Sequence, residues 1–426
     1  MTSAVVLGID IGTSGARSVA MDANGGVVAQ HAASLADFGP DGRDPALWWA
    51  AVEQSLFGCL ASVDRSGLRA IAVDGTSGTV LAAGADGTPL GVPLMYNDAV
   101  NEDVLVARIA PMIPEDSAAH GATSGLAKML VLRQCHRDAI LLHQADWIAG
   151  RLSGRFDVTD ENNALKSGYD PVAGRWPVWV ADTGLALDDL PRVLPPGERI
   201  GPIAAETARR FDLPGEVCVL AGTTDGCASF LATGASALGD GVTVLGSSLT
   251  LKLLSATPIF APRYGIYSHR LLGMWLAGGA SNSGGKVLAQ FFDGDALDRL
   301  SATLDPTTET GLNYYPLLRP GERFPVMDPV LPPRLAPRPS DDATFLKGML
   351  EGIAEIERLG YARLAELGAP PLATVRSVGG GAGNPQWTAM RGRMLGVPLI
   401  AAASVEAAAG TARLALAGAR RAGMLS

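Results

Sequence analysis

The sequence has 426 residues, of which 47% are hydrophobic and 18% are charged, and its formal net charge is −9. This length predicts two domains, and the apolar content excludes an intrinsically disordered chain. Acidic and basic residues are mixed without any Lys/Arg run, which argues against a nucleic-acid or anionic-membrane partner. The four cysteines form no CxxC pair, so neither a zinc site nor a disulfide framework is expected.

The chain opens with the pattern of a strand meander. Apolar segments over 4–10 and 16–22 flank a glycine-rich bend, and a shorter apolar segment follows at 27–30. Asp44 and Pro45 are typical of the N-cap and first position of a helix. Because no basic leader segment precedes the first strand, we expect a cytoplasmic protein.

The second half repeats the opening pattern. The chain returns to strand at 217–222, and 241–255 is again an apolar strand, a small-residue bend and an apolar strand, which predicts two related halves. The proline-rich segment 319–343 predicts an extended crossing, and apolar residues at helical spacing predict a helix over 342–367. Strands that lead into helices in both halves indicate α/β domains with mixed sheets.

The last hundred residues contain clear helix boundaries. A strand and three glycines over 374–381 precede Asn384, a good N-cap, and Pro385, which suits the first helical position. Gly396 is expected to end this helix, and a final alanine-rich helix is expected from about Glu406.

Residues 8–15, "GIDIGTSG", allow two interpretations. The segment is compatible with a plain hairpin, because Gly, Thr and Ser are common in turns. However, Asp10 lies inside an apolar strand, where an unpaired carboxylate is costly unless a cation or donor accompanies it. The bend that follows offers successive N–H groups that suit a phosphate.

Other glycine clusters fail as nucleotide motifs or remain ambiguous. In "GGASNSGGKV", Val287 follows Lys286 where a Walker A loop needs Ser or Thr, and 8–15 has neither the spacing nor the helix of a Rossmann fingerprint. The glycines of 378–387 suit close approach of a flat ring or phosphate, with Trp387 covering it. The alternative is that Trp387 belongs to the core stripe of its helix.

Asp225 also has two interpretations. It lies in "CVLAGTTDGCASF", residues 218–230, where an apolar run ends and a small-residue, helix-compatible run begins. It is either a helix cap, worth about 1 kcal/mol, or a catalytic base.

Taken together, these segments resemble the FGGY family of carbohydrate kinases nearly from end to end, and most closely the short D-ribulose kinases of cyanobacteria and plant plastids, some of which are described as xylulose kinase-like. The resemblance rests on ordered segments at 7–22, 72–82, 124–134, 144–154, 160–170, 221–226, 242–248, 311–317, 321–329 and 377–387.

This resemblance implies an α/β fold of two ribonuclease-H-like domains, as in the actin, Hsp70 and hexokinase superfamily, with a cleft between them. The sugar-binding domain is expected at 1–232 plus 406–426, and the nucleotide-binding domain at 233–405. The implied enzyme is a carbohydrate kinase that uses ATP and Mg²⁺ on a small ketose, as a monomer or homodimer.

The resemblance also implies the site residues. Asp225 would be the general base and contact the sugar, and Asp10 would hold magnesium through water and touch the sugar. Further sugar contacts are implied for Ser14 and Ser77. ATP-binding residues are implied at Gly12, Thr13, Gly246, Ser247, Gly380, Gly381, Asn384 and Trp387.

One departure concerns the sugar. Residues 95–103, "MYNDAVNED", lack the Trp and the Arg of the sugar-reading segment of longer family members. D-ribulose, phosphorylated at its 5-hydroxyl, is the expected substrate and D-xylulose the alternative. A sugar-independent ATPase or phosphatase of the same superfamily, and a non-catalytic nucleotide sensor, are the competing interpretations.

Overall fold

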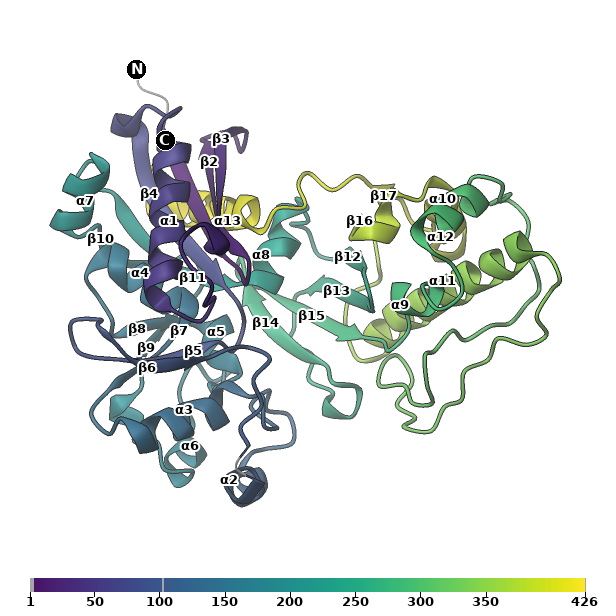
Figure 1. Ribbon diagram of the computed structural model, residues 1–426, viewed down its shortest axis with the longest axis horizontal. Helices are drawn as coiled ribbons and strands as arrows, with labels where there is room; N and C mark the ends of the chain where they lie inside the picture. The colour runs from purple at the N-terminus through teal and green to yellow at the C-terminus, as the bar shows by residue number, and fades with distance from the viewer. Residues whose placement is uncertain (1–3, 102, 426) are drawn as a thin grey trace. The chain divides into compact units, whose positions relative to one another are not determined.

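The computed structural model describes residues 4–101 and 103–425, which group into two compact units (Figure 1). The first unit contains the described part of Met1–Ala232, together with His269–Gly273 and Glu406–Ser426. The second contains Thr233–Ser268 and Met274–Val405. Residues 269–273, which the expected boundaries assign to the second domain, therefore group with the first unit. No helix in the described part of the chain is long and apolar enough to cross a membrane.

The first unit is built on a six-stranded mixed sheet. Its strand order is β10-β11-β4-β1-β2-β3, in which β1 pairs antiparallel with β2 and parallel with β4. The strands are β1 (Val5–Ile11), β2 (Gly15–Asp22), β3 (Val27–Ser34), β4 (Leu68–Gly75), β10 (Arg199–Pro202) and β11 (Cys218–Thr224). Because successive side chains of a strand point to opposite faces, the apolar strands supply two separate cores. Helices α1 (Pro45–Leu60) and α4 (Gln144–Ser153) cover one face, and α13 (Ala407–Arg421) covers the other.

A smaller layer of the first unit follows the end of β4. It contains two short sheets, β6-β5-β7 and β8-β9, with helices around them. The strands are β5 (Val80–Ala83), β6 (Pro89–Leu94), β7 (Ile140–His143), β8 (Val158–Asp160) and β9 (Arg192–Leu194). The remaining helices of the unit are α2 (Asp103–Ile109), α3 (Gly125–Cys135), α5 (Glu161–Leu165), α6 (Val178–Asp182), α7 (Ala205–Phe211) and α8 (Asp225–Ala232).

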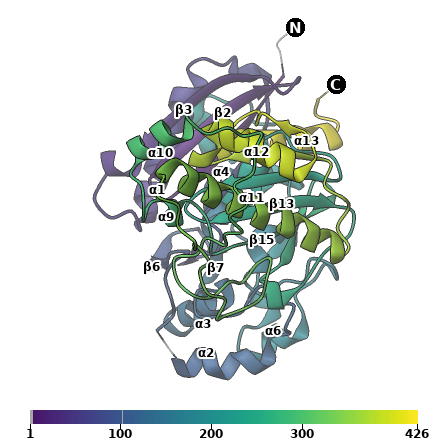
Figure 2. The same cartoon turned by 90° about the vertical axis from the view of Figure 1, so that its right-hand side faces the viewer.

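The second unit is built on another six-stranded mixed sheet, of order β14-β15-β13-β12-β16-β17. The strands are β12 (Asp240–Leu245), β13 (Leu249–Ser255), β14 (Tyr267–Leu271, of which residues 269–271 group with the first unit), β15 (Met274–Ala280), β16 (Thr374–Val378) and β17 (Leu399–Ile400). Its helices are α9 (Gly285–Leu288), α10 (Gly294–Ser301), α11 (Asp342–Glu366) and α12 (Pro385–Leu395). The long helix α11 packs against α10 and α12, as Figure 2 also shows.

The two sheets repeat one topology. In the first, β3-β2-β1 run antiparallel and β4 and β11 continue in parallel; in the second, β15-β13-β12 run antiparallel and β16 and β17 continue in parallel. The predicted repeat and the predicted α/β fold are therefore confirmed.

The helix boundaries expected from the sequence are also confirmed. Asp44 accepts a hydrogen bond at the start of α1, Asn384 caps α12, and Gly396 ends α12 in the left-handed region. The proline-rich segment behaves as expected, because residues 302–341 form no helix or strand.

Helix α13 lies unusually close to its neighbours in the first unit. A Cβ added at Gly410 of α13 would come within 1.8 Å of the Ala228 carbonyl oxygen in α8, and one added at Gly8 of β1 would come within 2.1 Å of the Ala412 nitrogen. Glycine at these positions is therefore required for α13 to contact both β1 and α8.

We predict that Gly410→Ala destabilises the protein by about 2 kcal/mol or more, because backbone atoms must move to admit the methyl group. Gly392→Ala is the matched control, since the added Cβ on α12 meets only Leu399 Cδ1 at 3.7 Å and helix propensity favours alanine. Urea unfolding of both variants checks this. Equal stability of Gly410→Ala and the parent would show that the helix contact is not tight.

Candidate functional site

Two buried carboxylates lie side by side in the first unit. Asp10 on β1 is the register partner of Asp74 on the parallel strand β4, and their exposed fractions are 5% and 0%. Both residues lie near the carboxyl ends of their strands, which is where sites form in α/β sheets. The sequence prediction singled out Asp10 but not Asp74.

The surroundings of Asp10 and Asp74 raise the pKa of both acids, and raise that of Asp74 more. Burial raises the pKa of Asp10, while a hydrogen bond from Asp74 and the Arg17 guanidinium, 3.2 Å away, oppose that rise. Burial raises the pKa of Asp74 well above its usual value, and the neighbouring Asp10 charge adds to the rise. Asp74 is therefore the acid of the pair that is harder to ionise. Its Oδ2 accepts a hydrogen bond from Thr411 of α13.

Asp225 follows the end of β11 and is the first residue of α8. Thr224 pairs with Gly75 and Ile11 also pairs with Gly75, so the ends of β11, β4 and β1 lie side by side. The half-buried carboxylate of Asp225 raises the pKa of both Asp10 and Asp74, which places the three acids within electrostatic reach.

The helix-cap interpretation of Asp225 describes only part of its surroundings. One carboxylate oxygen, Oδ1, accepts the Gly226 N–H at 2.7 Å, so the side chain does support the first turn of α8. Strand β11, which precedes Asp225, is held by other hydrogen bonds. The Thr223 hydroxyl accepts one from Asn162 Nδ2 at 2.9 Å, and the Thr223 carbonyl accepts one from Asn163 Nδ2 at 3.3 Å. The start of α8 is thus fixed independently of its acid.

The bend between β1 and β2 exposes part of its backbone. The Gly12 N–H donates to the Gly15 carbonyl at 3.0 Å, so this amide closes the turn. Thr13 and Ser14 are exposed, and the Ser14 carbonyl accepts the Leu35 N–H. Of the predicted phosphate-binding amides, that of Gly12 is therefore engaged within the bend itself.

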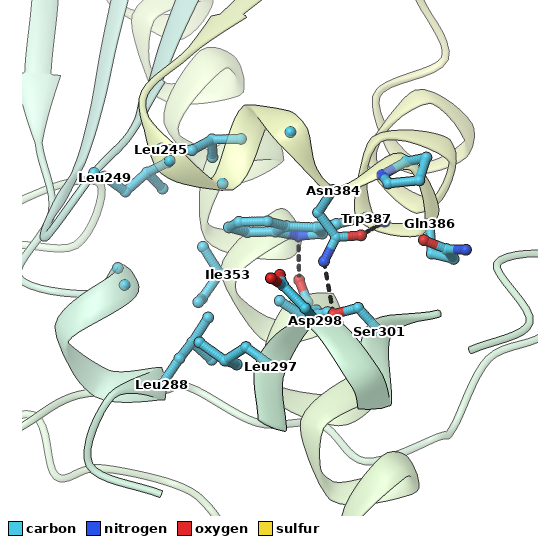
Figure 3. Close-up of a pocket in the computed structure, with 18 of the residues that line it drawn as sticks. Leu245, Leu249, Leu288, Leu297, Asp298, Ser301, Ile353, Asn384, Gln386 and Trp387 are labelled. Atoms are coloured by element: carbon cyan, nitrogen blue, oxygen red, sulfur yellow. Dashed lines mark hydrogen bonds between the residues drawn. The ribbon is translucent and has the colours of Figure 1, made fainter. Parts of the chain in front are cut away.

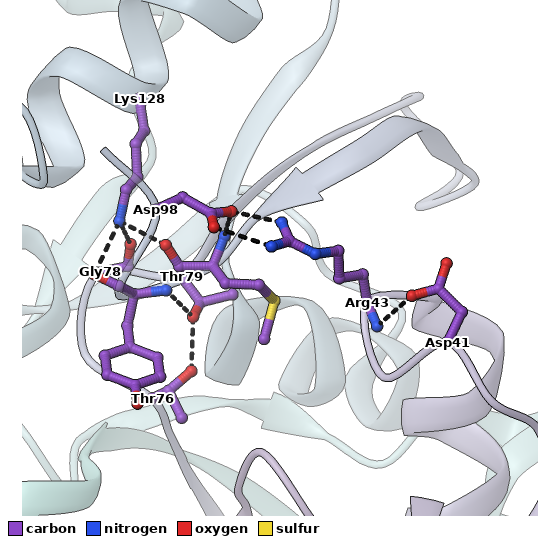
Figure 4. A network of polar contacts seen from close by, with 9 residues as sticks. Asp41, Arg43, Thr76, Gly78, Thr79, Asp98 and Lys128 are labelled. Carbon is purple, nitrogen blue, oxygen red and sulfur yellow. Dashed lines mark hydrogen bonds and ion pairs between the residues drawn. The ribbon is translucent and has the colours of Figure 1, made fainter. Parts of the chain in front are cut away.

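Ser77 lies in the loop after β4, which a polar network holds against the segment at residues 95–98 (Figure 4). The buried ammonium of Lys128 donates to three carbonyl oxygens, of Gly78 at 2.8 Å, Met95 at 2.7 Å and Tyr96 at 3.1 Å. The Ser77 hydroxyl is buried and makes no hydrogen bond within the described structure.

Asp98 and Arg43 extend this network. Asp98 forms a bidentate ion pair with Arg43, in which Arg43 Nη2 is 2.9 Å from Asp98 Oδ1. Asp98 also accepts a hydrogen bond from the Met95 N–H at 2.8 Å. The Arg43 hydrogen bonds hold the pKa of Asp98 below its usual value. Arg43, from the loop before α1, therefore pairs with Asp98 of the segment 95–103, which lacks the Arg found in longer members of the family that the sequence resembles.

The carboxylates of this site suit a divalent cation that is bound partly through water better than one coordinated only by protein side chains. Within the described residues, no three His, Cys, Asp or Glu side chains are grouped so as to hold a metal ion. Mg²⁺ normally keeps several waters and uses one or two carboxylates together with substrate phosphates. Asp10, at a strand end beside Asp74 and paired with Arg17, fits that role.

The second unit contains a cavity of about 430 Å³, a size typical of small-molecule sites (Figure 3). It lies between the ends of β12 and β16 and helices α9 to α12. Of the predicted ATP-binding residues, five line it: Gly246, Gly380, Gly381, Asn384 and Trp387. Ser247 does not line the cavity and is exposed in the adjacent bend.

Trp387 is both a core residue and a wall of the cavity. It is 3% exposed, and its indole nitrogen donates to the Leu350 carbonyl at 3.0 Å. A Cβ on Gly381 would come within 2.4 Å of the indole ring, so only glycine fits there. Asn384 joins two elements, because it accepts the Trp387 N–H and donates to Ser301 Oγ at 2.8 Å.

Sequence reasoning missed the other half of this cavity. The unpredicted walls are apolar or polar residues of β12, β13, α9, α10 and α11, including Leu245, Leu249, Leu288, Leu297, Asp298, Ser301, Ala302, Leu350 and Ile353. They form no local motif, since each is an ordinary residue of its own element and only folding brings them together.

We predict that Thr411→Val destabilises the protein by about 1–3 kcal/mol, because it removes the hydroxyl that donates a hydrogen bond to buried Asp74. Thr411→Ser keeps that hydroxyl and is expected to retain most of the stability. Chemical denaturation of the two variants measures the difference. Unchanged stability of Thr411→Val would show that the hydroxyl does not stabilise Asp74.

Comparisons with known proteins agree with this geometry. Residues 235–419 match the C-terminal domain of the FGGY family of carbohydrate kinases. The xylulose kinase of Staphylococcus epidermidis is 22% identical over 423 residues, covering 94% of this chain and 84% of its own. The xylulose kinase of Lactococcus lactis is 25% identical over 411 residues, covering 89% and 81%.

A solved structure described as a xyloylose kinase, from Brucella ovis, is similar in fold with a TM-score of 0.82 at 23% identity, covering 98% of this chain and 91% of that one. The chain therefore has the α/β fold of this solved sugar kinase, and its residues 235–419 match the C-terminal domain of the FGGY family of carbohydrate kinases.

Proposed function

We propose that this protein is an ATP-dependent kinase that phosphorylates a ketopentose at its primary 5-hydroxyl. The observation that carries the proposal is the neighbouring pair of Asp10 and Asp225 at the strand ends of the first unit. A sensor or a structural domain has no need of two acids there. The FGGY-type C-terminal domain and the similarity to xylulose kinases support the same class of reaction.

In this proposal Asp225 is the general base. Its carboxylate accepts the proton of the ketose hydroxyl while that oxygen attacks the γ-phosphorus in line. The bond from the γ-phosphorus to the bridging oxygen breaks, and its electron pair leaves with ADP. The half-buried position of Asp225 lets it reach a bound substrate while staying fixed by the Gly226 N–H.

Asp10 would hold Mg²⁺ through water and contact the sugar. The metal, when bound with ATP, offsets the charge that develops on the phosphoryl oxygens. The Arg17 guanidinium, 3.2 Å from Asp10, favours the ionised carboxylate and opposes the effect of burial on its pKa.

The cavity of the second unit would take the adenosine. Gly380 and Gly381 leave room for the ring, and Asn384 and Trp387 form the wall beside them. Phosphates would be bound by backbone amides of the small-residue bends, at Thr13 and at Gly246 and Ser247, while the Gly12 amide closes the first bend. Ser14 and Ser77 would contact the ketose.

Two ketopentoses are candidates. D-ribulose is favoured by the sequence resemblance to the short D-ribulose kinases, and by the absence of the sugar-reading Trp and Arg from 95–103. D-xylulose is favoured by the relatives of this chain that are described as xylulose kinases. The proposal at the level of a ketopentose holds for either sugar.

The test is ADP release with Mg-ATP against D-ribulose, L-ribulose, D-xylulose, D-fructose and glycerol. We expect one pentulose to stimulate release strongly, and we expect Asp225→Asn to lose at least about a thousandfold in kcat, because no other base is supplied in its place. Nucleotide affinity and thermal stability of the variant serve as controls, and both should stay close to the parent values.

Two outcomes would contradict the proposal. ADP release that no ketose or polyol increases would identify a sugar-independent ATPase or a nucleotide sensor. Turnover that survives in Asp225→Asn would leave Asp225 with only a helix-capping role.

Lys128 would position the loop after β4, which contains the proposed sugar contact Ser77, against residues 95–96. Its ammonium has three N–H groups for three carbonyls, so each donor is used. Burial lowers the pKa of Lys128 to about 8, while the Asp98 carboxylate opposes this effect and Lys166 adds to it. Above this pH the neutral amine has two N–H groups, and one of the three loop carbonyls loses its donor.

We therefore predict that the KM for the ketose rises as the pH increases from 7 to 9, by roughly three- to tenfold for the loss of one hydrogen bond. The kcat should change less. In Lys128→Met the KM should be raised at every pH, without this pH-dependent step. If parent and variant show the same KM profile, another group is responsible.

A further inference from the structure

The amide of Gln144 is a buried hydrogen-bond donor that the fold leaves without a partner. Gln144 is the first residue of α4, directly after β7, and is 1% exposed. Its Nε2 makes no hydrogen bond within the described structure. A buried N–H group without an acceptor is rare and costly, so it calls for an explanation.

The orientation of this amide is set by its neighbours. The backbone N–H of Thr76 is 3.1 Å from Gln144 Oε1, and the Thr76 hydroxyl is 2.7 Å from the same oxygen. A backbone N–H only donates, so the atom that faces it must be the oxygen. The two N–H donors of Nε2 consequently point away from Thr76.

A directed chain of hydrogen bonds ends on Gln144. The Tyr96 N–H donates to Thr79 Oγ1 at 2.9 Å, and the two threonine hydroxyls are 2.6 Å apart (Figure 4). Since Thr76 uses its proton toward Gln144, Thr79 must donate to Thr76. Each hydroxyl in the chain accepts one hydrogen bond and donates one. The terminal amide nitrogen is the group that remains unsatisfied.

This donor lies next to the acids of the same unit. A Cβ on Gly75, the last residue of β4, would be 3.3 Å from Gln144 Oε1, so the amide lies at the end of that strand. Gly75 is flanked by Ile11 and Thr224, which adjoin Asp10 and Asp225. The Ser77 hydroxyl, close by in the same loop, is also buried and without a hydrogen bond.

We propose that Gln144 is a substrate-binding and specificity-determining residue, whose Nε2 donates to an oxygen of the ketose. The inference rests on the proposed function and names a contact that sequence patterns did not indicate. A polyhydroxylated substrate provides the acceptor that the buried amide lacks, and the adjacent Ser77 hydroxyl binds a second oxygen. A substrate without an oxygen at that position leaves the amide unpaired and is discriminated against.

The test compares Gln144→Glu with the parent enzyme. Glutamate keeps an oxygen for Thr76, so the hydrogen-bond chain persists, while the NH₂ donor is replaced by oxygen. We expect the KM for the preferred pentulose to rise about tenfold or more, with a smaller change in kcat. Gln134→Glu, at an exposed position of α3, makes the same chemical change and should behave like the parent.

Direct sugar binding provides a second readout that does not require turnover. Thermal stabilisation by the pentulose should be present in the parent and in Gln134→Glu, and lost in Gln144→Glu and in Gln144→Met. Equal ketose KM and equal stabilisation in the parent and Gln144→Glu would overturn the role of Gln144, while leaving the kinase proposal intact. A parent that no ketose stimulates or stabilises would overturn both.

Discussion

The alignment of three parallel strand ends is the constraint on which the rest of the first unit depends. Strands β1, β4 and β11 carry Asp10, Asp74 and the residue before Asp225 to one edge of the sheet. Burying acids there is costly, and the structure offsets that cost in two ways: Arg17 pairs with Asp10, and Thr411 of α13 donates to Asp74. The close approach of α13, which needs Gly8 and Gly410, is what brings that hydroxyl to the strand. Packing and chemistry are therefore coupled through one helix.

The polar groups around these strand ends belong to a single connected set. Lys128 holds the loop after β4 against residues 95–98, and the threonine chain passes from that loop to Gln144. Arg43 fixes Asp98 from a third segment. Within the described residues, Gln144 Nε2 and Ser77 Oγ are two of the buried polar atoms near these strand ends that have no hydrogen-bond partner; Asp74 Oδ1 and Asn163 Oδ1 are others. The hydrogen bonds of Thr76, Thr79 and Lys128 hold Gln144 and the loop that contains Ser77 in place for a ligand.

The second unit has the same sheet topology but a different arrangement at its strand ends. Its bend after β12 and its glycine turn after β16 leave an apolar cavity rather than a row of acids. Trp387 is buried by its packing and still presents its ring beneath Gly381, so the core and ligand-site interpretations of this residue are compatible. The repeated strand order thus places buried acids at the strand ends of one sheet and a largely apolar cavity at the strand ends of the other.

Local patterns in the sequence determined the strand meanders, the capped helices at Asp44 and Asn384, the extended proline-rich crossing and the repeated half, because each depends on residues near one another in the chain. Asp10 stood out for the same reason, as a carboxylate within an apolar strand. Tertiary structure alone decided the remainder. Asp74 is the register partner of Asp10, although 64 positions separate the two residues in the sequence. Arg43 pairs with Asp98, and Gln144 accepts hydrogen bonds from Thr76. The walls of the cavity come from five elements. These side chains carry no local signal, since their chemistry depends on burial and on partners that only the folded chain supplies.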